Sequence, residues 1–300
     1  MIGLTIKQLR YFDALARHHH FGRAAEACSI SQPALSLQIK DLENMAGAPL
    51  VERGARTIHL TALGEDFILK AREVLIAVDE LEDLMRASQG PFAGRFRLGV
   101  IPTVAPYLLP DTITALSTHF PEIELELRES VTKSLVADLL ESRLDAAIVA
   151  LPISEPMLRE FALFQEDFVL VRPLNDAKKP VPSPDMLKTM RLLLLEEGHC
   201  FRDQALSFCE IGKAQPRQLM EGSSLSTLVQ MVGAGMGVTL IPEMAIALET
   251  RATDVSVVRF PPPRPSRTIG MVWRKSNPLG DQLMHVGAIV RGVGQAKRDT

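Results

Sequence analysis

The sequence has few cysteines and no long hydrophobic run. Three cysteines in 300 residues, Cys28, Cys200 and Cys209, are too few for a structural disulfide framework, so we expect reduced thiols by default. No apolar stretch approaches the roughly 18 residues that a membrane-spanning helix needs. The first ten residues lack the basic region and apolar core of a signal peptide. We therefore expect a cytoplasmic protein with no membrane partner.

Neither sign of charge dominates the chain. The formal net charge is −3, which excludes a protein that coats nucleic acid along its whole surface, so any DNA-binding charge must be local. The hydrophobic fraction of 46% is ample for sizeable cores, and the length fits about two domains. Cys200 and Cys209 are too far apart for a zinc motif and no second close pair exists. We expect neither a metal nor a cofactor.

The first sixty residues have the pattern of short helices followed by a hairpin. Helical spacing predicts helices over residues 5–19 and 22–29. A third helix begins after Ser31, a typical N-cap, with Pro33 in its first turn, and ends at Gly47. Residues 50–60 alternate around Gly54, which predicts a small two-stranded wing. The apolar residues expected to face the core of the third helix are Leu35, Ile39, Leu42 and Met45.

A long helical pattern over residues 61–89 follows the wing. It is too long and too one-sided for a compact core helix, so we interpret it as a dimerising helix. The sequence Gly-Pro-Phe-Ala-Gly at residues 90–94 then breaks it, as a hinge does. Its apolar positions are Leu63, Phe67, Ala71, Val74, Leu75, Val78, Leu81 and Met85.

Strands and helices alternate beyond the hinge. This alternation predicts an α/β architecture with largely parallel sheets. The expected strands cover residues 96–101, 124–128, 146–150, 168–172, 191–195, 218–221, 238–241 and 269–273.

Residues 24–43 have the character of a helix-turn-helix. Two short helices joined by a tight turn let the second helix enter the major groove, where short polar side chains reach base edges. A generic three-helix bundle that binds protein is the alternative. Besides flanking Arg23 and Arg56, the expected DNA-binding residues are Gln32, Pro33, Ser36, Gln38, Lys40 and Arg53, with Lys40 and the arginines suited to phosphate.

This segment resembles the LysR-type transcriptional regulators. The shared positions are Ala24-Ala25, Ser31-Gln32, Ala34, Ser36, Gln38-Ile39, Leu42-Glu43, Gly47, Leu50, Arg53 and the run from Leu60 to Gly64. The resemblance extends over the whole chain in length and domain order. It implies operator DNA and RNA polymerase as partners, homodimers that assemble into homotetramers, and no enzymatic activity.

The same resemblance implies a multidomain fold. An all-α winged helix-turn-helix (residues 1–60) precedes a dimerising linker helix (61–89) and a hinge (90–95). An α/β regulatory domain (96–300) follows, two-lobed and like periplasmic binding proteins. Lobe I comprises residues 96–166 and 268–300, and lobe II residues 167–267.

A pair of cysteines lies in a segment with unusual local chemistry. The strand at 191–195 runs into a turn at Gly198, and a helix begins near Phe201, which places Cys200 at a helix N-terminus. The helix dipole there favours a thiolate, and His199 is a neighbour that could add to the effect. Cys209 lies nine residues further, about 13.5 Å along a helix, beyond the reach of a disulfide. If the two bond, the helix must reorganise, which makes the segment a two-state element.

The cysteine segment resembles the peroxide-sensing members of the LysR-type group. That resemblance implies that Cys200 is the peroxidatic cysteine, oxidised first to sulfenic acid, and that Cys209 resolves it. Pro102 and Phe201 depart from the residues common there, histidine and leucine. The resemblance implies that the residues around the peroxide are Thr103, Thr132, His199, Asp203 and Arg267.

Three functions compete. The first is a DNA-binding regulator that is switched by hydrogen peroxide through the Cys200–Cys209 disulfide and controls oxidative-stress genes. The second is a regulator of the same family that binds a small organic effector between its lobes. The third is a thiol peroxidase with an appended DNA-binding domain. The second thiol favours the first function, because a cleft binder has no need of it.

Overall fold

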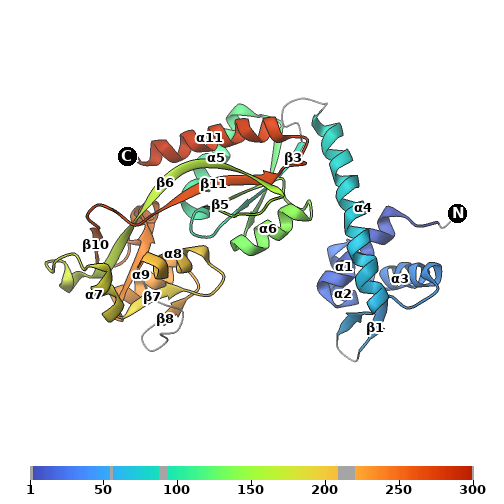
Figure 1. Ribbon diagram of the computed structural model, residues 1–300, viewed down its shortest axis with the longest axis horizontal. Helices are drawn as coiled ribbons and strands as arrows, with labels where there is room; N and C mark the ends of the chain where they lie inside the picture. Colours follow the sequence, from blue (N-terminus) through green and yellow to red (C-terminus); the bar gives the residue numbers. More distant parts are fainter. Residues whose placement is uncertain (1–2, 55–56, 88–93, 209–219, 299–300) are drawn as a thin grey trace. The chain divides into compact units, whose positions relative to one another are not determined.

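The computed structural model describes residues 3–54, 57–87, 94–208 and 220–298. The chain forms two compact units, residues 1–83 and 84–300 (Figure 1). Cys209 and most of the hinge expected at 90–95 lie outside the described residues. Within the described ranges, no helix is both long and apolar enough to cross a membrane.

The first unit has the expected helices and wing. Residue patterns set the helix ends: the Thr5 side chain accepts from the Gln8 backbone N–H in a capping box, and Ser31 Oγ accepts from Ala34 N. Gly47 ends the third helix with a φ of 70°, a left-handed conformation that glycine adopts without strain. The elements are α1 (Ile6–His18), α2 (Phe21–Ala27), α3 (Gln32–Ala46), β1 (Val51–Arg53), β2 (Ile58–Leu60) and α4 (Ala62–Ala87).

The core of this unit confirms the inward face of α3. Leu35, Ile39 and Leu42 are buried, while Met45 is only partly so. Cys28 packs against the same core, and burial raises the pKa of its thiol against the opposing effect of a nearby arginine. This agrees with its expected role as a small core residue.

Helix α4 has two apolar faces rather than one. Ile68, Ala71 and Leu75 are buried against the helix-turn-helix core. The prediction of a single apolar stripe was therefore wrong, because the inner part of that stripe is used within the chain. The exposed apolar side chains, which we call the α4 stripe, are Leu63, Leu69, Val74, Leu81, Leu84 and Met85.

The second unit alternates strands and helices. Its strands are β3 (Gly94–Val100), β4 (Ile123–Glu129), β5 (Ala146–Leu151), β6 (Leu158–Pro173), β7 (Leu192–Leu195), β8 (Met220–Gly222), β9 (Val238–Pro242), β10 (Val255–Arg259) and β11 (Ser266–Arg274). Its α-helices are α5 (Ala105–His119), α6 (Thr132–Leu140), α7 (Pro184–Thr189), α8 (Cys200–Phe208), α9 (Leu225–Gly233), α10 (Ile246–Glu249) and α11 (Gly280–Arg298).

The strands form one mixed sheet in the order β4-β3-β5-β11-β6-β9-β7-β8, with β10 also paired to β6. The expectation of largely parallel sheets was wrong, because β6 and β11 run antiparallel to their neighbours. Strand β6 is also longer than expected, starting ten residues before residue 168. Its first part pairs with β11, and its last part pairs with β9 and β10.

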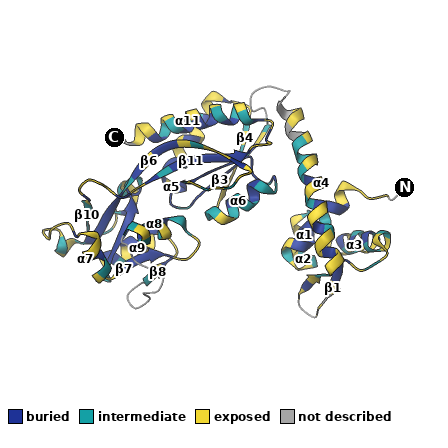
Figure 2. Cartoon of the chain, viewed as in Figure 1, coloured by how far each residue is buried: buried dark blue, intermediate teal, exposed yellow. Residues whose placement is uncertain are grey.

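Two hydrophobic cores divide this unit into lobes. The lobe I core gathers side chains from β3, β5, β11, α5, α6 and α11, and the lobe II core gathers those from β7, β9, α8 and α9. Strand β6 contributes to both cores, and its central residues are buried (Figure 2). The lobe boundaries expected near residues 167 and 267 fall inside β6 and β11. The chain therefore passes between the lobes within β6 and at the start of β11, and β6 packs in both cores.

Candidate functional site

Cys200 is the first residue of α8, as the sequence predicts. Strand β7 ends at Leu195, and the turn that follows has Gly198 at a φ of 98°, a left-handed conformation suited to glycine. The backbone N–H of Arg202 donates to the carbonyl of His199 at 3.0 Å, which closes the first turn. Cys200 is partly buried and packs against the core of lobe I, although α8 belongs to lobe II.

A small cleft brings Cys200 together with three of the predicted residues. Thr103, Thr132 and His199 share this cleft with the thiol, and its empty space is about 170 Å³. Thr103 follows β3 and Thr132 opens α6, so lobe I supplies both hydroxyls while lobe II supplies the cysteine and the imidazole. The remaining wall consists of Ile101, Pro102, Val131 and Phe201.

Arg267 contacts this site through Thr103. Its Nη1 donates to Thr103 Oγ1 at 2.8 Å and its Nη2 to the Thr103 carbonyl at 3.0 Å. Its Nε donates to Glu166 Oε2 at 2.8 Å, in a fully buried ion pair. Burial raises the pKa of Glu166, against the opposing effect of Arg267. A buried guanidinium with its donors satisfied in this way is held in one orientation.

Thr132 and His199 complete the cleft. Thr132 Oγ1 is buried and has no hydrogen-bond partner among the described residues, so its hydrogen-bonding capacity is unused at the wall of the cleft. Burial lowers the pKa of His199, and the nearby carboxylate of Glu196 opposes this effect. The imidazole is therefore neutral at pH 7, with one nitrogen that donates and one that accepts.

Two other residues do not join the cleft. Asp203 is exposed in the first turn of α8 and is not among the described residues that line the cleft, so its supporting role stays a prediction. Arg202 donates to the Leu195 carbonyl at 2.9 Å and pairs with Glu221, which accounts for its charge. Cys209 lies outside the described residues.

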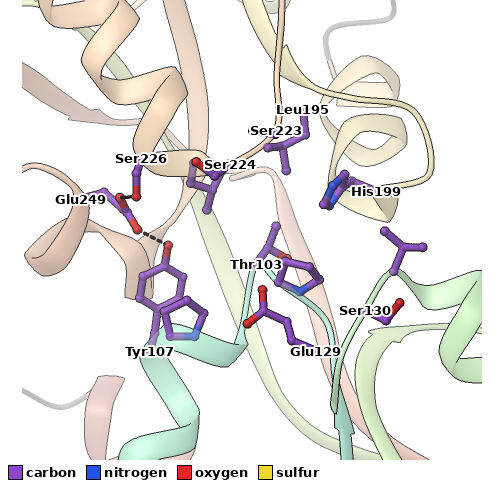
Figure 3. A pocket seen from close by; sticks show the side chains of 14 residues that line it. Thr103, Tyr107, Glu129, Ser130, Leu195, His199, Ser223, Ser224, Ser226 and Glu249 are labelled. Carbon is purple, nitrogen blue, oxygen red and sulfur yellow. Dashed lines mark hydrogen bonds between the residues drawn. The ribbon is translucent and has the colours of Figure 1, made fainter. Parts of the chain in front are cut away.

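A larger cleft adjoins the small one between the lobes. It holds about 830 Å³ of empty space, part of it open to solvent, and Thr103 and His199 are among its lining residues (Figure 3). The same two residues also line the small cleft. At one side Tyr107 Oη donates to Glu249 Oε1 at 2.6 Å, and Ser226 Oγ donates to Glu249 Oε2 at 2.5 Å. Among the described residues, no three His, Cys, Asp or Glu side chains gather as metal ligands do.

The sequence analysis did not predict the role of Glu166 or the Tyr107–Glu249 contact between the lobes. Tyr107 extends from α5 into the lobe II core, and burial raises the pKa of its phenol, with the Glu249 hydrogen bond adding to the effect. One sequence feature could have identified Glu166: it is an acidic residue flanked, two positions away on each side, by the apolar residues Phe164 and Phe168. A charged side chain buried in such a strand needs a buried partner. Nothing in the sequence pointed to Glu249.

The predicted DNA-binding residues lie along α3 and the wing. Gln32, Pro33 and Lys40 are exposed, and Ser36 and Gln38 are partly exposed. The backbone of Arg53 belongs to β1. Glu43 Oε1 accepts from Leu50 N and Val51 N at 2.9 and 3.2 Å, which fixes the wing against α3. The polar face of α3 is thus open to a ligand, while its apolar face is packed.

Two known families match this chain. Residues 6–65 match the bacterial regulatory helix-turn-helix proteins of the lysR family, and residues 89–293 match the LysR substrate binding domain. Together these matches cover the helix-turn-helix, the wing, the first turn of α4 and nearly all of the second unit.

Relatives match over almost the full length. A probable hydrogen peroxide-inducible genes activator of Streptomyces viridosporus is 41% identical, covering 98% of this chain and 95% of its own. The DNA-binding transcriptional dual regulator OxyR of Escherichia coli is 38% identical, covering 96% and 95%.

Solved structures agree. A full-length OxyR variant from Pseudomonas aeruginosa has a TM-score of 0.74 at 35% identity, covering 96% of this chain and 95% of its own. A hydrogen peroxide-bound OxyR mutant of Corynebacterium glutamicum has a TM-score of 0.67 at 33% identity, covering 98% and 93%. These findings confirm the expected helix-turn-helix and two-lobed regulatory domain. The chain belongs to the LysR family of helix-turn-helix transcription regulators, in the group of OxyR hydrogen peroxide-inducible genes activators.

Proposed function

We propose that this regulator senses hydrogen peroxide at Cys200 and that Cys209 resolves the oxidised form. The observation that carries the proposal is the small cleft, where the Cys200 thiol shares one wall with Thr103, Thr132 and His199. Two hydroxyls and a neutral imidazole can donate to and accept from both peroxide oxygens. Cys200 is the first residue of α8, so its thiol lies at a helix N-terminus, a position typical of reactive cysteines.

The chemistry has two steps. The Cys200 thiolate attacks one peroxide oxygen, the O–O bond breaks, and hydroxide leaves, which gives a sulfenic acid. Arg267 donates to Thr103 Oγ1, so that hydroxyl keeps its own proton for the departing oxygen. The Cys209 thiol then attacks the Cys200 sulfur, a disulfide forms, and the sulfenic oxygen leaves as water.

Operator DNA would be bound by α3 and the wing. Gln32, Ser36 and Gln38 suit base edges, while Pro33 begins the helix and Lys40 and Arg53 suit phosphates. The regulator would contact RNA polymerase from the operator. The disulfide form would change the spacing of paired helix-turn-helix units in a homotetramer.

Dimerisation is assigned to the α4 stripe. Leu81, Leu84 and Met85 are each about 60% exposed, whereas the other face of α4 is buried in its own unit. A second α4 helix would cover these side chains with apolar surface. The homodimer formed in this way would pair again through the regulatory domains.

The direct test is peptide mapping after a near-stoichiometric dose of peroxide. We expect a linked Cys200–Cys209 peptide by mass spectrometry and altered operator binding or transcription. Cys200→Ser should abolish the response and keep DNA binding, and Cys28→Ser is the matched control that should respond normally. A Cys200→Ser protein that still switches with peroxide would refute the assignment.

The larger cleft supports a second candidate function, binding of a small organic effector. Its cavity volume of about 380 Å³ is enough for such a molecule, and the N-terminus of α9, with exposed Ser223, Ser224 and Ser226, lines it. An effector that changes DNA binding equally in wild type and Cys200→Ser would favour this function. Sustained peroxide turnover with a thiol reductant would instead favour a peroxidase, because a sensor needs only slow re-reduction.

A further inference from the structure

Phe201, the residue after Cys200, is buried and contacts a ring on one side and a guanidinium on another. Its side chain is 2% exposed and packs in the lobe II core. Its ring meets the Phe168 ring edge-on, with centroids 4.9 Å apart. On another side, the Arg267 guanidinium carbon lies 5.2 Å from the ring centroid, which is a cation–π contact.

These contacts belong to one face of the sheet. Arg267 and Glu166 are direct partners in the antiparallel β6–β11 ladder, so their side chains project from the same face. Phe168 lies two residues after Glu166 on β6, and alternation along a strand places it on that face as well. Phe201 therefore ties the first turn of α8 to β6, which runs through both lobes, and to the start of β11.

The disulfide step must displace this anchor. With α8 intact, the Cα atoms of Cys200 and Phe208 are about 12 Å apart. Wherever residue 209 lies, its Cα is about 3.8 Å from that of Phe208, so it stays roughly 8 Å or more from Cys200. A disulfide needs Cα atoms within about 7 Å.

For the disulfide to form, the Cys200 end of α8 has to move. The cleft around Cys200 has only about 170 Å³ of empty space, with no room for even a water-sized sphere, and is walled by Pro102, Thr103, Val131 and Thr132, so a second cysteine with its backbone cannot enter it. Cys200 must leave the cleft to meet its partner. The peptide bond that joins Phe201 to it transmits this movement to the anchored ring.

We infer that Phe201 is a positioning residue that holds Cys200 in the peroxide cleft and sets the rate of disulfide closure. The inference rests on the proposed function. The inference treats sulfenic acid formation and disulfide closure separately, because Glu166 and Thr103 hold Arg267 in place without the Phe201 ring. Phe201 lines the cleft only as an apolar wall that leucine can also provide. Sulfenic acid formation should therefore depend little on the aromatic ring, whereas disulfide closure should be slowed by it. The peroxide sensitivity of the switch is then partly set by an apolar wall residue that offers peroxide no hydrogen bond.

The test compares both steps in Phe201→Leu. The first step is measured in a Cys209→Ser background by trapping the Cys200 sulfenic acid with a dimedone reagent. The second is measured in the full chain by quenched mass spectrometry of the linked peptide. We expect sulfenic acid formation within twofold of the parent and closure roughly tenfold faster, a factor that corresponds to about 1.4 kcal/mol.

A matched control is Phe161→Leu on β6. It removes another cation–π contact, with the Arg291 guanidinium carbon 4.2 Å from the ring centroid, but does not touch α8. Both of its rates should match the parent. If Phe201→Leu does not fold, Phe168→Leu loosens the same ring from one side and should accelerate closure by a smaller factor.

The outcomes are distinct. Normal sulfenic acid formation with unchanged or slower closure in Phe201→Leu overturns the anchor alone, and so does parallel slowing of both steps. Failure of the unsubstituted protein to form any sulfenic acid at Cys200 overturns the proposed function and the anchor together.

Discussion

Arg267 donates two hydrogen bonds to Thr103, one to the side-chain oxygen at 2.8 Å and one to the carbonyl at 3.0 Å. The pair joins β11 to the loop after β3, and Thr103 is the member of the pair that lines the small cleft. The charge of Arg267 thus reaches the cleft through a neutral hydroxyl. This arrangement makes Thr103 the residue at which the contribution of Arg267 can be measured.

Replacing Thr103 tests that arrangement. Thr103→Val keeps the shape and the carbonyl acceptor but removes the hydroxyl, so the departing oxygen loses a donor. We expect the second-order rate of Cys200 sulfenic acid formation to fall about 100-fold, the usual cost of one such donor. Thr103→Ser, which retains the hydroxyl, should keep most of the rate. Equal rates for the valine and serine variants would remove Thr103 from the reaction.

The acidity of His199 gives a pH prediction. Burial lowers its pKa, and Glu196 opposes this effect, so the imidazole should titrate below about 6.5, the ordinary value. As the pH falls, the unfolded chain takes up this proton first. The contribution of His199 to folding stability is therefore present above about pH 6.5 and is lost as the pH falls through the lowered folded pKa.

An NMR titration of the His199 ring checks this directly. Glu196→Gln should lower the midpoint further, because the carboxylate that favours the protonated ring is gone. His199→Gln should remove this part of the pH dependence of unfolding. A His199 midpoint at or above 6.5 would contradict the role of burial.

The Tyr107–Glu249 hydrogen bond joins the lobes and should contribute to stability. Tyr107→Phe leaves a buried carboxylate oxygen without its donor, at a cost of about 1–3 kcal/mol in the free energy of unfolding. Urea unfolding followed by the fluorescence of Trp273, the chain's single tryptophan, reports on this unit. Tyr11→Phe, at the only other tyrosine, is the control and should leave this transition in place.

The same bond predicts behaviour at high pH. Burial raises the pKa of Tyr107 above its ordinary value of about 10, and Glu249 adds to the effect. The stabilisation is therefore full below about pH 10 and is lost as the pH rises toward the raised folded pKa, since the unfolded phenol ionises first. The alkaline decline in stability should be shallower in Tyr107→Phe. An unchanged alkaline profile would argue against a buried phenol.

Two variants of α3 separate specificity from affinity. Gln32→Ala should lower discrimination at one operator position by about 1–3 kcal/mol while sparing non-specific binding. Lys40→Ala should weaken binding to all sequences alike and reduce the salt slope by about one. Binding titrations over a range of salt, on operator and on scrambled DNA, distinguish these results. A uniform loss for both variants would show that Gln32 reads no base.

The α4 stripe predicts a dimer that one charge disrupts. Leu81 is 61% exposed, so Leu81→Glu should leave the fold of its own unit intact while placing a carboxylate in the interface. We expect monomers by analytical ultracentrifugation at micromolar concentration and weaker operator binding. Leu174→Glu is the control, since Leu174 is 52% exposed but lies far along the chain in lobe II. Association unchanged by Leu81→Glu would place the dimer contact elsewhere.

The sequence predicted the N-terminal unit well because its signals are local. Caps at Ser31 and Gly47 and the apolar spacing of Leu35, Ile39 and Leu42 depend on residues within a few turns of one another. The start of α8 at Cys200 was predicted for the same reason. Only the family resemblance identified Thr103 and Thr132 as site residues, because no local pattern distinguishes them from ordinary threonines.

What the sequence could not predict depends on pairing between distant segments. The length of β6 was missed because its residues near Glu160 alternate weakly, and only pairing with β11 makes them a strand. Glu166 and Glu249 have partners more than 100 residues away in Arg267 and Tyr107. The sequence also did not show that some apolar residues of α4 pack against the helix-turn-helix core, because apolar spacing looks the same for residues that pack within the chain and for residues that bind a partner.

Strand β6 is about 50 Å long if it has ordinary strand geometry, and it is held to β11 by nine registered residue pairs. The β6–β11 ladder ends at Asp167, and the rest of β6 pairs with β9 and β10, so swinging one lobe against the other would strain β6 where its partners change. Refolding the short α8 is far cheaper. The fold therefore favours a sheet that stays rigid while the short helix α8 changes conformation. The response to an oxidant should be all-or-none rather than graded.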